Sequence, residues 1–244
     1  LGTPQQYIGF SPRPDFVDSQ WSSHYAQYDP ELAKSLLDQT GAVDTNGDGF
    51  RELPNGDALT LNINFATQGI GGGEVELVAR YWNDVGVKTV FKEVTPDEYR
   101  SAQSSNNLDV GAWKKGMPSA LIMGEGKLFV PPYEDYFAHT NAMLWAEYID
   151  TNGVSGVQPP GYAMEMIENI AAFQAAPLGS AENAALGEKL VASMTSNMLF
   201  IGTVAAPFPV YHRNALKNFT QFTTASYEYY RTYPYLPQQW YLSE

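Results

Sequence analysis

The fold is decided by residues 28–94, which open with YDPELAKSLLDQTG at residues 28–41. Asp29 is a good helix N-cap, because its carboxylate can accept hydrogen bonds from the unpaired amides of the first turn. Pro30 suits the first helical position, and Gly41 suits the left-handed residue that ends a helix. This pattern predicts a helix whose apolar face carries Leu32, Ala33, Leu36 and Leu37.

A strand-helix-strand unit is predicted after this helix. Residues 59–65, LTLNINF, alternate apolar and polar side chains, as a half-buried strand does. An amphipathic helix over residues 73–85 leads through Gly86 into a strand over residues 87–94. We expect the two strands to be parallel, with a right-handed crossover between them.

The same order continues for one more helix and strand. Thr95 and Glu98 form a capping-box pattern at the start of a helix. Residues 108–113, LDVGAW, predict a third strand. The sequence therefore predicts an α/β fold in which a mixed sheet with a β-α-β-α-β core is flanked by helices.

The rest of the chain is less regular. Gly and Pro predict a long loop from Gly116 to Pro132. Residues 135–148 are expected to be partly helical, and residues 161–174 and 180–197 are better helices. An apolar strand is expected from Met198 to His212, interrupted by Pro207 and Pro209.

Composition limits the classes of function. The 244 residues contain 14 Lys and Arg and no Cys, and the formal net charge is −13. Nucleic-acid binding needs clustered positive charge, so this balance argues against it. The lack of Cys excludes disulfides and cysteine metal sites, which is compatible with an oxidising compartment without requiring one.

The run at residues 28–38, the turn DTNGDGFRE at residues 44–52 and the strand after them resemble bacterial extracellular solute-binding proteins, family 5. This is the dipeptide and oligopeptide-binding class that feeds ABC importers. The resemblance continues weakly through residues 108–113 and 199–204. It implies one lobe of a two-lobe, type II-like periplasmic binding protein that captures a peptide or an oligosaccharide and delivers it to a membrane permease.

The matched segment forms the second lobe of such proteins, so we expect the first lobe to be missing and the chain to be a piece of a longer protein. The resemblance implies a periplasmic or extracellular location, with lipid anchoring in some relatives. Three segments are predicted: an irregular N-terminal segment packed on the lobe (1–27), the ligand-binding lobe (28–212) and an aromatic-rich segment facing the missing lobe (213–244).

Five residues are candidates for ligand contact. Trp113 ends the third strand, and ligands of α/β sheets collect at the carboxyl ends of strands. Lys114 follows it directly. The resemblance places the loop that contains Thr67 and Gln68 at the border of the cleft. Peptide binders of this class hold the peptide amino terminus with an Asp shortly after the tryptophan, whereas here Glu125 is the first acidic residue, so an oligosaccharide ligand stays an alternative.

The acidic turn is a candidate calcium site. Asp44, Asn46, Asp48 and Gly49 occupy the first, third, fifth and sixth positions of a calcium loop. The twelfth position is Asn55, where a bidentate Glu would be expected. We therefore favour a rigid Asx and Gly turn that introduces a strand, with a structural calcium ion as the alternative and no other cofactor.

Two further patterns in the sequence bear on function. Residues 69–74, GIGGGE, resemble a dinucleotide-binding glycine loop, with Glu93 near the position of a ribose-binding acid. Glu74 and Glu76, however, would put negative charge where a pyrophosphate would lie. An enzyme acting on a small polar ligand is the second alternative. His24, His139 and His212 do not have the spacing of metal ligands, so such an enzyme would need a carboxylate pair that the fold brings together.

Overall fold

The computed structural model describes residues 2–10, 12–113, 126–135, 138–205, 211–219 and 236–243. The chain divides into two compact units. Unit 1 comprises Leu1–Gln27, Lys115–Val130 and Pro160–Glu244, and unit 2 comprises Tyr28–Lys114 and Pro131–Pro159. The two long helices after Pro160 pack with the N-terminal segment, and the segments 1–27, 28–212 and 213–244 stay predictions.

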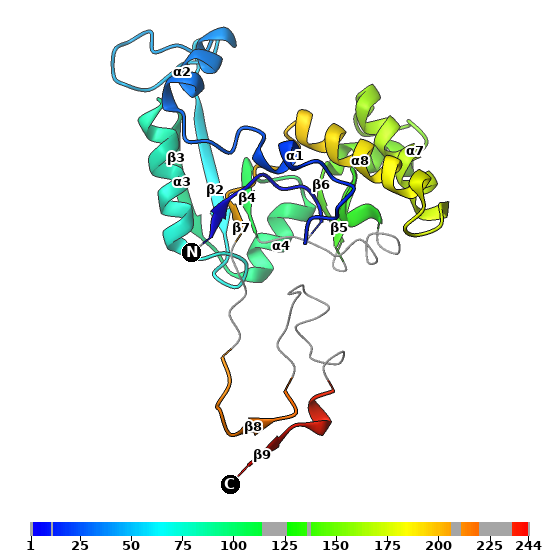
Figure 1. Cartoon of the computed structure of the whole chain (residues 1–244). Coiled ribbons are helices and arrows are strands. Elements are labelled where there is room, and N and C mark those ends of the chain that lie inside the picture. Colours follow the sequence, from blue (N-terminus) through cyan, green and yellow to red (C-terminus); the bar gives the residue numbers. More distant parts are fainter. Residues whose placement is uncertain are drawn as a thin grey trace. The chain divides into compact units, whose positions relative to one another are not determined.

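Unit 2 contains the predicted β-α-β-α-β order (Figure 1). The strands β2 (Thr60–Phe65), β3 (Lys88–Glu93) and β4 (Val110–Ala112) form a sheet in the order β3-β2-β4, and both pairs are parallel. The helices between them are α3 (Gly72–Asp84) and α4 (Pro96–Ser104). The α/β fold and the parallel pairing of the first two strands are therefore confirmed.

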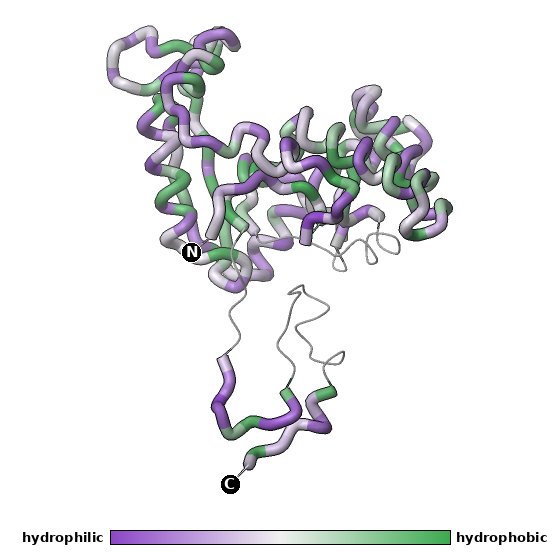
Figure 2. The backbone as a smooth tube through the Cα atoms, in the orientation of Figure 1, coloured by the Kyte–Doolittle hydropathy of each residue, from purple (hydrophilic) through white to green (hydrophobic). Residues whose placement is uncertain are grey.

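Helix α3 covers one face of this sheet. Ile63 and Phe65 of β2 pack against Val75 and Ala79 of α3, and all four side chains are at most 3% exposed. Figure 2 shows that hydrophobic and hydrophilic residues alternate along α3. This pattern lets a surface helix bury one apolar face and expose the other face to solvent. Of the apolar positions predicted for this helix, Val75 lies in this core and Val78 and Trp82 pack against it, whereas Leu77 and Tyr81 are exposed.

The first predicted helix forms as α2 (Pro30–Gln39). Its start is capped as expected, since Asp29 Oδ1 accepts a hydrogen bond from the Leu32 amide at 2.9 Å. Gly41 adopts a φ of +81° just after the helix. The predicted apolar face is not buried, however: α2 has no buried residue, and Leu32 and Leu36 are 42% and 38% exposed.

The remainder of unit 2 contains a hairpin that the sequence analysis missed. Strands β5 (Tyr133–Asp135) and β6 (Ala138–Asn141) pair antiparallel, and α6 (Met143–Asp150) follows. The partly helical character expected for residues 135–148 is confirmed by α6, whereas the strand before it was not predicted. Within the part of the chain that the structure describes, no helix is long and apolar enough to cross a membrane.

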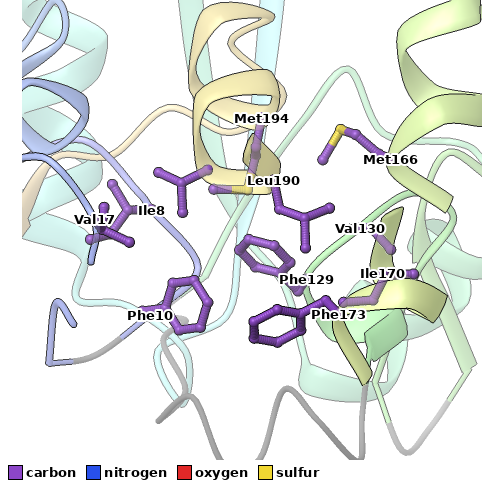
Figure 3. Close-up of a cluster of buried hydrophobic side chains, with 11 residues drawn as sticks. Ile8, Phe10, Val17, Phe129, Val130, Met166, Ile170, Phe173, Leu190 and Met194 are labelled. Atoms are coloured by element: carbon purple, nitrogen blue, oxygen red, sulfur yellow. The ribbon is translucent and has the colours of Figure 1, made fainter. Parts of the chain in front are cut away.

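Unit 1 is built on α7 (Gly161–Ala175) and α8 (Ala181–Ser196), which pack side by side and confirm both predicted helices. The shorter elements are α1 (Ser19–Ser23) and η1 (Gly126–Leu128). The apolar side chains of the N-terminal segment meet these helices in the core shown in Figure 3, with Phe10, Phe129, Phe173, Leu190 and Met194 all at most 3% exposed. The N-terminal segment is thus part of this core.

The predicted strand from Met198 to His212 is mostly wrong. Met198 has a φ of +47°, which ends α8 and turns the chain. Among the described residues of this range, β7 (Val204–Ala205) is the part that forms a strand, antiparallel to β1 (Thr3–Pro4). Residues 206–210 lie outside the described residues.

The C-terminal segment is described only in part. Strands β8 (Leu216–Lys217) and β9 (Tyr241–Leu242) pair antiparallel, with η4 (Pro237–Gln239) before β9. The aromatic run at residues 227–235 lies outside the described residues. The expectation that residues 213–244 face another lobe stays a prediction.

Candidate functional site

Three of the candidate residues lie at one edge of the unit 2 sheet. Parallel strands end at the same edge, and ligands of α/β sheets collect there. Thr67 and Gln68 follow β2 closely, Trp113 follows β4, and Glu93 is the last residue of β3. We call Thr67, Gln68, Glu93 and Trp113 the strand-end site.

The strand-end site contains a polar pair that the sequence analysis did not propose. Thr67 Oγ1 donates a hydrogen bond to Glu93 Oε1, and both residues are exposed. The sequence relates Glu93 only to the position of a ribose-binding acid. The sequence holds no separate signal for this pair, because it follows from the register of the parallel ladder, in which Glu93 lies beside Phe65, two residues before Thr67. The pair offers oxygen atoms that can bind donor groups of a polar ligand.

Trp113 packs against helix α4. The guanidinium carbon of Arg100 lies 4.6 Å from the centroid of a Trp113 ring, a cation–π contact. The Tyr99 ring centroid lies 5.0 Å from that of Trp113, with an interplanar angle of 32°. Trp113 is only partly exposed. The other two candidates, Lys114 and Glu125, lie outside the described residues, so their roles stay predictions.

The acidic turn is closed by its own hydrogen bonds. Asp44 accepts from the amides of Gly47 at 2.7 Å and Gly49 at 2.9 Å. Asn46 Oδ1 accepts from the Asp48 amide, and Asp48 Oδ1 accepts from the Phe50 amide, both at 2.8 Å. These bonds are those of successive Asx turns.

Glu52 completes this turn and was missed from the sequence. Its Oε2 accepts from the amide and hydroxyl of Thr45, at 2.8 and 2.6 Å, and its Oε1 accepts from Asn46 Nδ2 at 2.9 Å. Carboxylate oxygens of Asp44, Asp48 and Glu52 lie within 4.8 Å of one another, so they could hold a metal ion. Asn55, the expected twelfth position, bonds instead to Asp57 at 2.8 Å. The signal for Glu52 was its place as the ninth residue of the loop.

A hollow of about 400 Å³ lies beside the acidic turn, with Lys34, Asp38, Asp44, Arg51 and Asp84 among its lining residues. All of them come from segments outside the strand-end site. The Arg51 guanidinium in its wall is engaged by Asp38 and by backbone carbonyls. The hollow therefore carries structural contacts and not the candidate ligand residues.

Residues 1–120 match the family model described as bacterial extracellular solute-binding proteins, family 5 Middle. No curated protein matches the chain.

Several solved structures share the fold. The oligopeptide-binding protein OppA has a TM-score of 0.75 at 22% identity, and the match covers 100% of this chain and 40% of that one. A periplasmic oligopeptide-binding protein of Thermotoga maritima with bound mannohexaose has a TM-score of 0.59 at 20% identity, covering 83% and 36%. MelB of Agrobacterium fabrum, in complex with stachyose, has a TM-score of 0.64 at 18% identity, covering 84% and 30%. The chain thus spans 30–40% of the length of these proteins.

Proposed function

Since residues 1–120 match the bacterial extracellular solute-binding proteins, family 5, we propose that the chain belongs to this family and is part of the substrate-binding component of an ABC importer. The proposed ligand is an oligopeptide-type solute, captured in a cleft between two lobes outside the cytoplasmic membrane. Delivery to a membrane permease completes the function. The family match is the observation that carries this proposal.

The strand-end site supports a binding role. It combines a hydroxyl, an amide and a carboxylate with a tryptophan at the sheet edge where α/β proteins bind ligands. These groups can accept and donate hydrogen bonds to a polar ligand. We propose Thr67 and Gln68 as direct ligand contacts, and Lys114 and Glu125 as further contacts from the adjoining segment.

The proposed mechanism is hinge closure. A ligand that contacts both lobes only in the closed form shifts the population toward that form. The chain spans 40% of the length of OppA, so a second lobe would supply the remaining contacts. Alone, this chain should bind its ligand weakly.

An oligosaccharide is the second candidate ligand. Two of the similar structures are named for complexes with mannohexaose and stachyose. Hydroxyl, amide and carboxylate groups also suit sugar hydroxyls.

Thermal shift of the purified chain tests the proposal, with alanine peptides of two to five residues, mannohexaose and stachyose each at millimolar concentration. We expect a saturable rise in Tm with peptides, and mass spectrometry should recover the peptide unchanged. The variant Thr67→Val should lose most of the shift, whereas Thr203→Val in unit 1 should keep it. A shift with sugars alone would assign the second candidate, hydrolysis of a probe would assign an enzyme, and no shift with any probe would contradict binding.

A further inference from the structure

Trp113 lies against a glycine of the turn that carries Thr67 and Gln68. A β-carbon built on Gly69 would come within 2.7 Å of Trp113 Cζ3, and nearer still to Cε3 and Cδ2. Gly69 is buried, and its φ is not positive, so L-residues could adopt its backbone conformation. The glycine is therefore required here by the space that the indole occupies.

Besides the Thr67 side-chain bond to Glu93, two backbone hydrogen bonds close the turn. Ala66 O accepts hydrogen bonds from the amides of Gly69 at 2.7 Å and Ile70 at 3.2 Å. Thr67 and Gln68 lie between these bonds and are both exposed. The indole under Gly69 is thus the packing that supports the exposed part of the turn.

The other contacts of Trp113 fix the indole. Tyr99 is 1% exposed and, with Ala66 and Val94, forms a small core on which Trp113 packs. The Tyr99 hydroxyl would lie 2.7 Å from a β-carbon on Gly111, so Tyr99 also rests directly on β4. Arg100 adds the cation–π contact. Helix α4, β4 and the Ala66–Ile70 turn therefore meet at one side chain.

We propose that Trp113 is a positioning residue: packed between Gly69 and the Tyr99–Arg100 pair, it holds the Ala66–Ile70 turn so that Thr67 and Gln68 face the ligand. This inference rests on the proposed function of the strand-end site. It differs from the sequence expectation that Trp113 contacts the ligand. The stacking of a sugar or side chain needs an open aromatic face, whereas the Trp113 indole packs against Tyr99, Arg100 and Gly69 and is only partly exposed.

A double-mutant cycle between Gly69 and Trp113 tests the packing. Gly73→Ala is the matched control, because a β-carbon on Gly73 meets nothing within 4 Å. In the Gly69→Ala variant we expect the backbone amides at positions 69 and 70 to exchange at least tenfold faster, as measured by hydrogen exchange. The Trp113 resonance in ¹⁹F NMR of 5-fluorotryptophan protein should shift. Trp113→Leu should also accelerate exchange, and adding Gly69→Ala to it should change little further. Additive effects, or a Gly69→Ala variant that behaves like Gly73→Ala, would overturn the proposal.

A binding experiment separates positioning from stacking. Trialanine and mannohexaose serve as probes of the folded chain, and the affinity of each is measured by ¹⁹F and amide NMR titration. We expect Gly69→Ala to weaken binding at least fivefold. Trp113→Phe keeps an aromatic ring in the same place, so it should restore part of the turn order that is lost in Trp113→Leu. Unchanged affinity in Gly69→Ala, despite a disordered turn, would refute the positioning role. If neither probe binds the wild-type chain, the proposed function fails. The hydrogen-exchange data still test whether Trp113 packs against Gly69 and supports the turn.

Discussion

Arg51 Nη1 donates a hydrogen bond to Asp38 Oδ1 at 2.5 Å, which connects the segment before β2 to helix α2. The two partners differ in burial: the Arg51 side chain is 11% exposed and the Asp38 side chain 58%. Arg51 also donates to the carbonyls of Ala42 at 2.6 Å and Val85 at 2.9 Å. Its backbone bonds to Gly86 as well. One arginine therefore joins the ends of α2 and α3.

This asymmetry predicts unequal effects of removing the two partners. Arg51→Met should lower the free energy of unfolding by about 3 kcal/mol, because two carbonyls lose their donor in a poorly hydrated place. Asp38→Asn should cost less than about 1 kcal/mol, since an exposed ion pair contributes little. Urea unfolding measures both, with the exposed Arg213→Met as control. Equal losses for the two variants would show that the ion pair itself dominates.

The sequence predicted the strands and helices of unit 2 well where local rules act. Caps such as Asp29 and Thr95 accept hydrogen bonds from amides of the first turn, as expected. Alternation in β2 placed Ile63 and Phe65 in the core. The acidic turn also follows local Asx chemistry, which needs no tertiary contact.

What the sequence did not reveal depends on distant contacts. Leu36 of α2 and Leu190 of α8 sit on similar helical patterns, yet Leu190 is fully buried and Leu36 is 38% exposed. The Thr67–Glu93 pair arises only when two strands align in register. Gly69 reads as a flexible turn residue, and the indole that requires it lies more than 40 positions further along the chain.

Glu52 should stabilise the acidic turn without a metal ion. Glu52→Ala removes the acceptor for three donors of Thr45 and Asn46, and Glu52 is 8% exposed, so we expect a loss of about 2 kcal/mol in unfolding free energy. Glu134→Ala, at a half-buried Glu of unit 2, provides a comparison. Thermal unfolding in EDTA and in 2 mM Ca²⁺, which is roughly 2,000 times a Kd of about 1 μM, should give the same Tm. A calcium-dependent rise would instead assign the structural ion.

Tyr7 should make the stability of unit 1 fall at high pH. Burial raises the pKa of the Tyr7 phenol above its ordinary value of 10.0, and the ring packs edge-on against Phe200. Above pH 10 the unfolded chain releases this proton while the folded chain keeps it, so the unfolded state binds fewer protons and stability decreases as pH rises. The slope for this group approaches about 1.4 kcal/mol per pH unit.

Urea unfolding at pH 8, 10 and 11 measures this effect. The variant Tyr7→Phe should lose less stability than the wild type between pH 10 and 11. Tyr211→Phe, at a side chain that is 90% exposed, should follow the wild type. If Tyr7→Phe also follows the wild type, Tyr7 is not the titrating group.

Gly202 should be intolerant of any side chain, because two backbone segments touch there. A β-carbon on Gly202 would come within 2.6 Å of the Gln6 carbonyl carbon, and close to Gln5 O and Tyr7 N. The same crossing is held by the Gln6 side chain, which is 3% exposed and whose Oε1 accepts from the amides of Tyr7 and Gly202. Backbone atoms cannot rotate away as a side chain could, so Gly202→Ala must push the segments apart.

We expect Gly202→Ala to lower the free energy of unfolding by about 2 kcal/mol or more, an overpacking cost that urea unfolding measures. Hydrogen exchange should also show faster exchange of the Gln5 amide, which bonds to Thr203 O at 3.4 Å beside the β1–β7 pair. The matched control is Gly161→Ala at the start of α7, where a β-carbon meets nothing within 4 Å. That variant should be neutral or stabilising by up to about 1 kcal/mol, because alanine restricts the unfolded chain. If the two variants are equally stable, the two backbone segments can separate without a cost in free energy. The Gln6 side chain alone would then not hold the segments together.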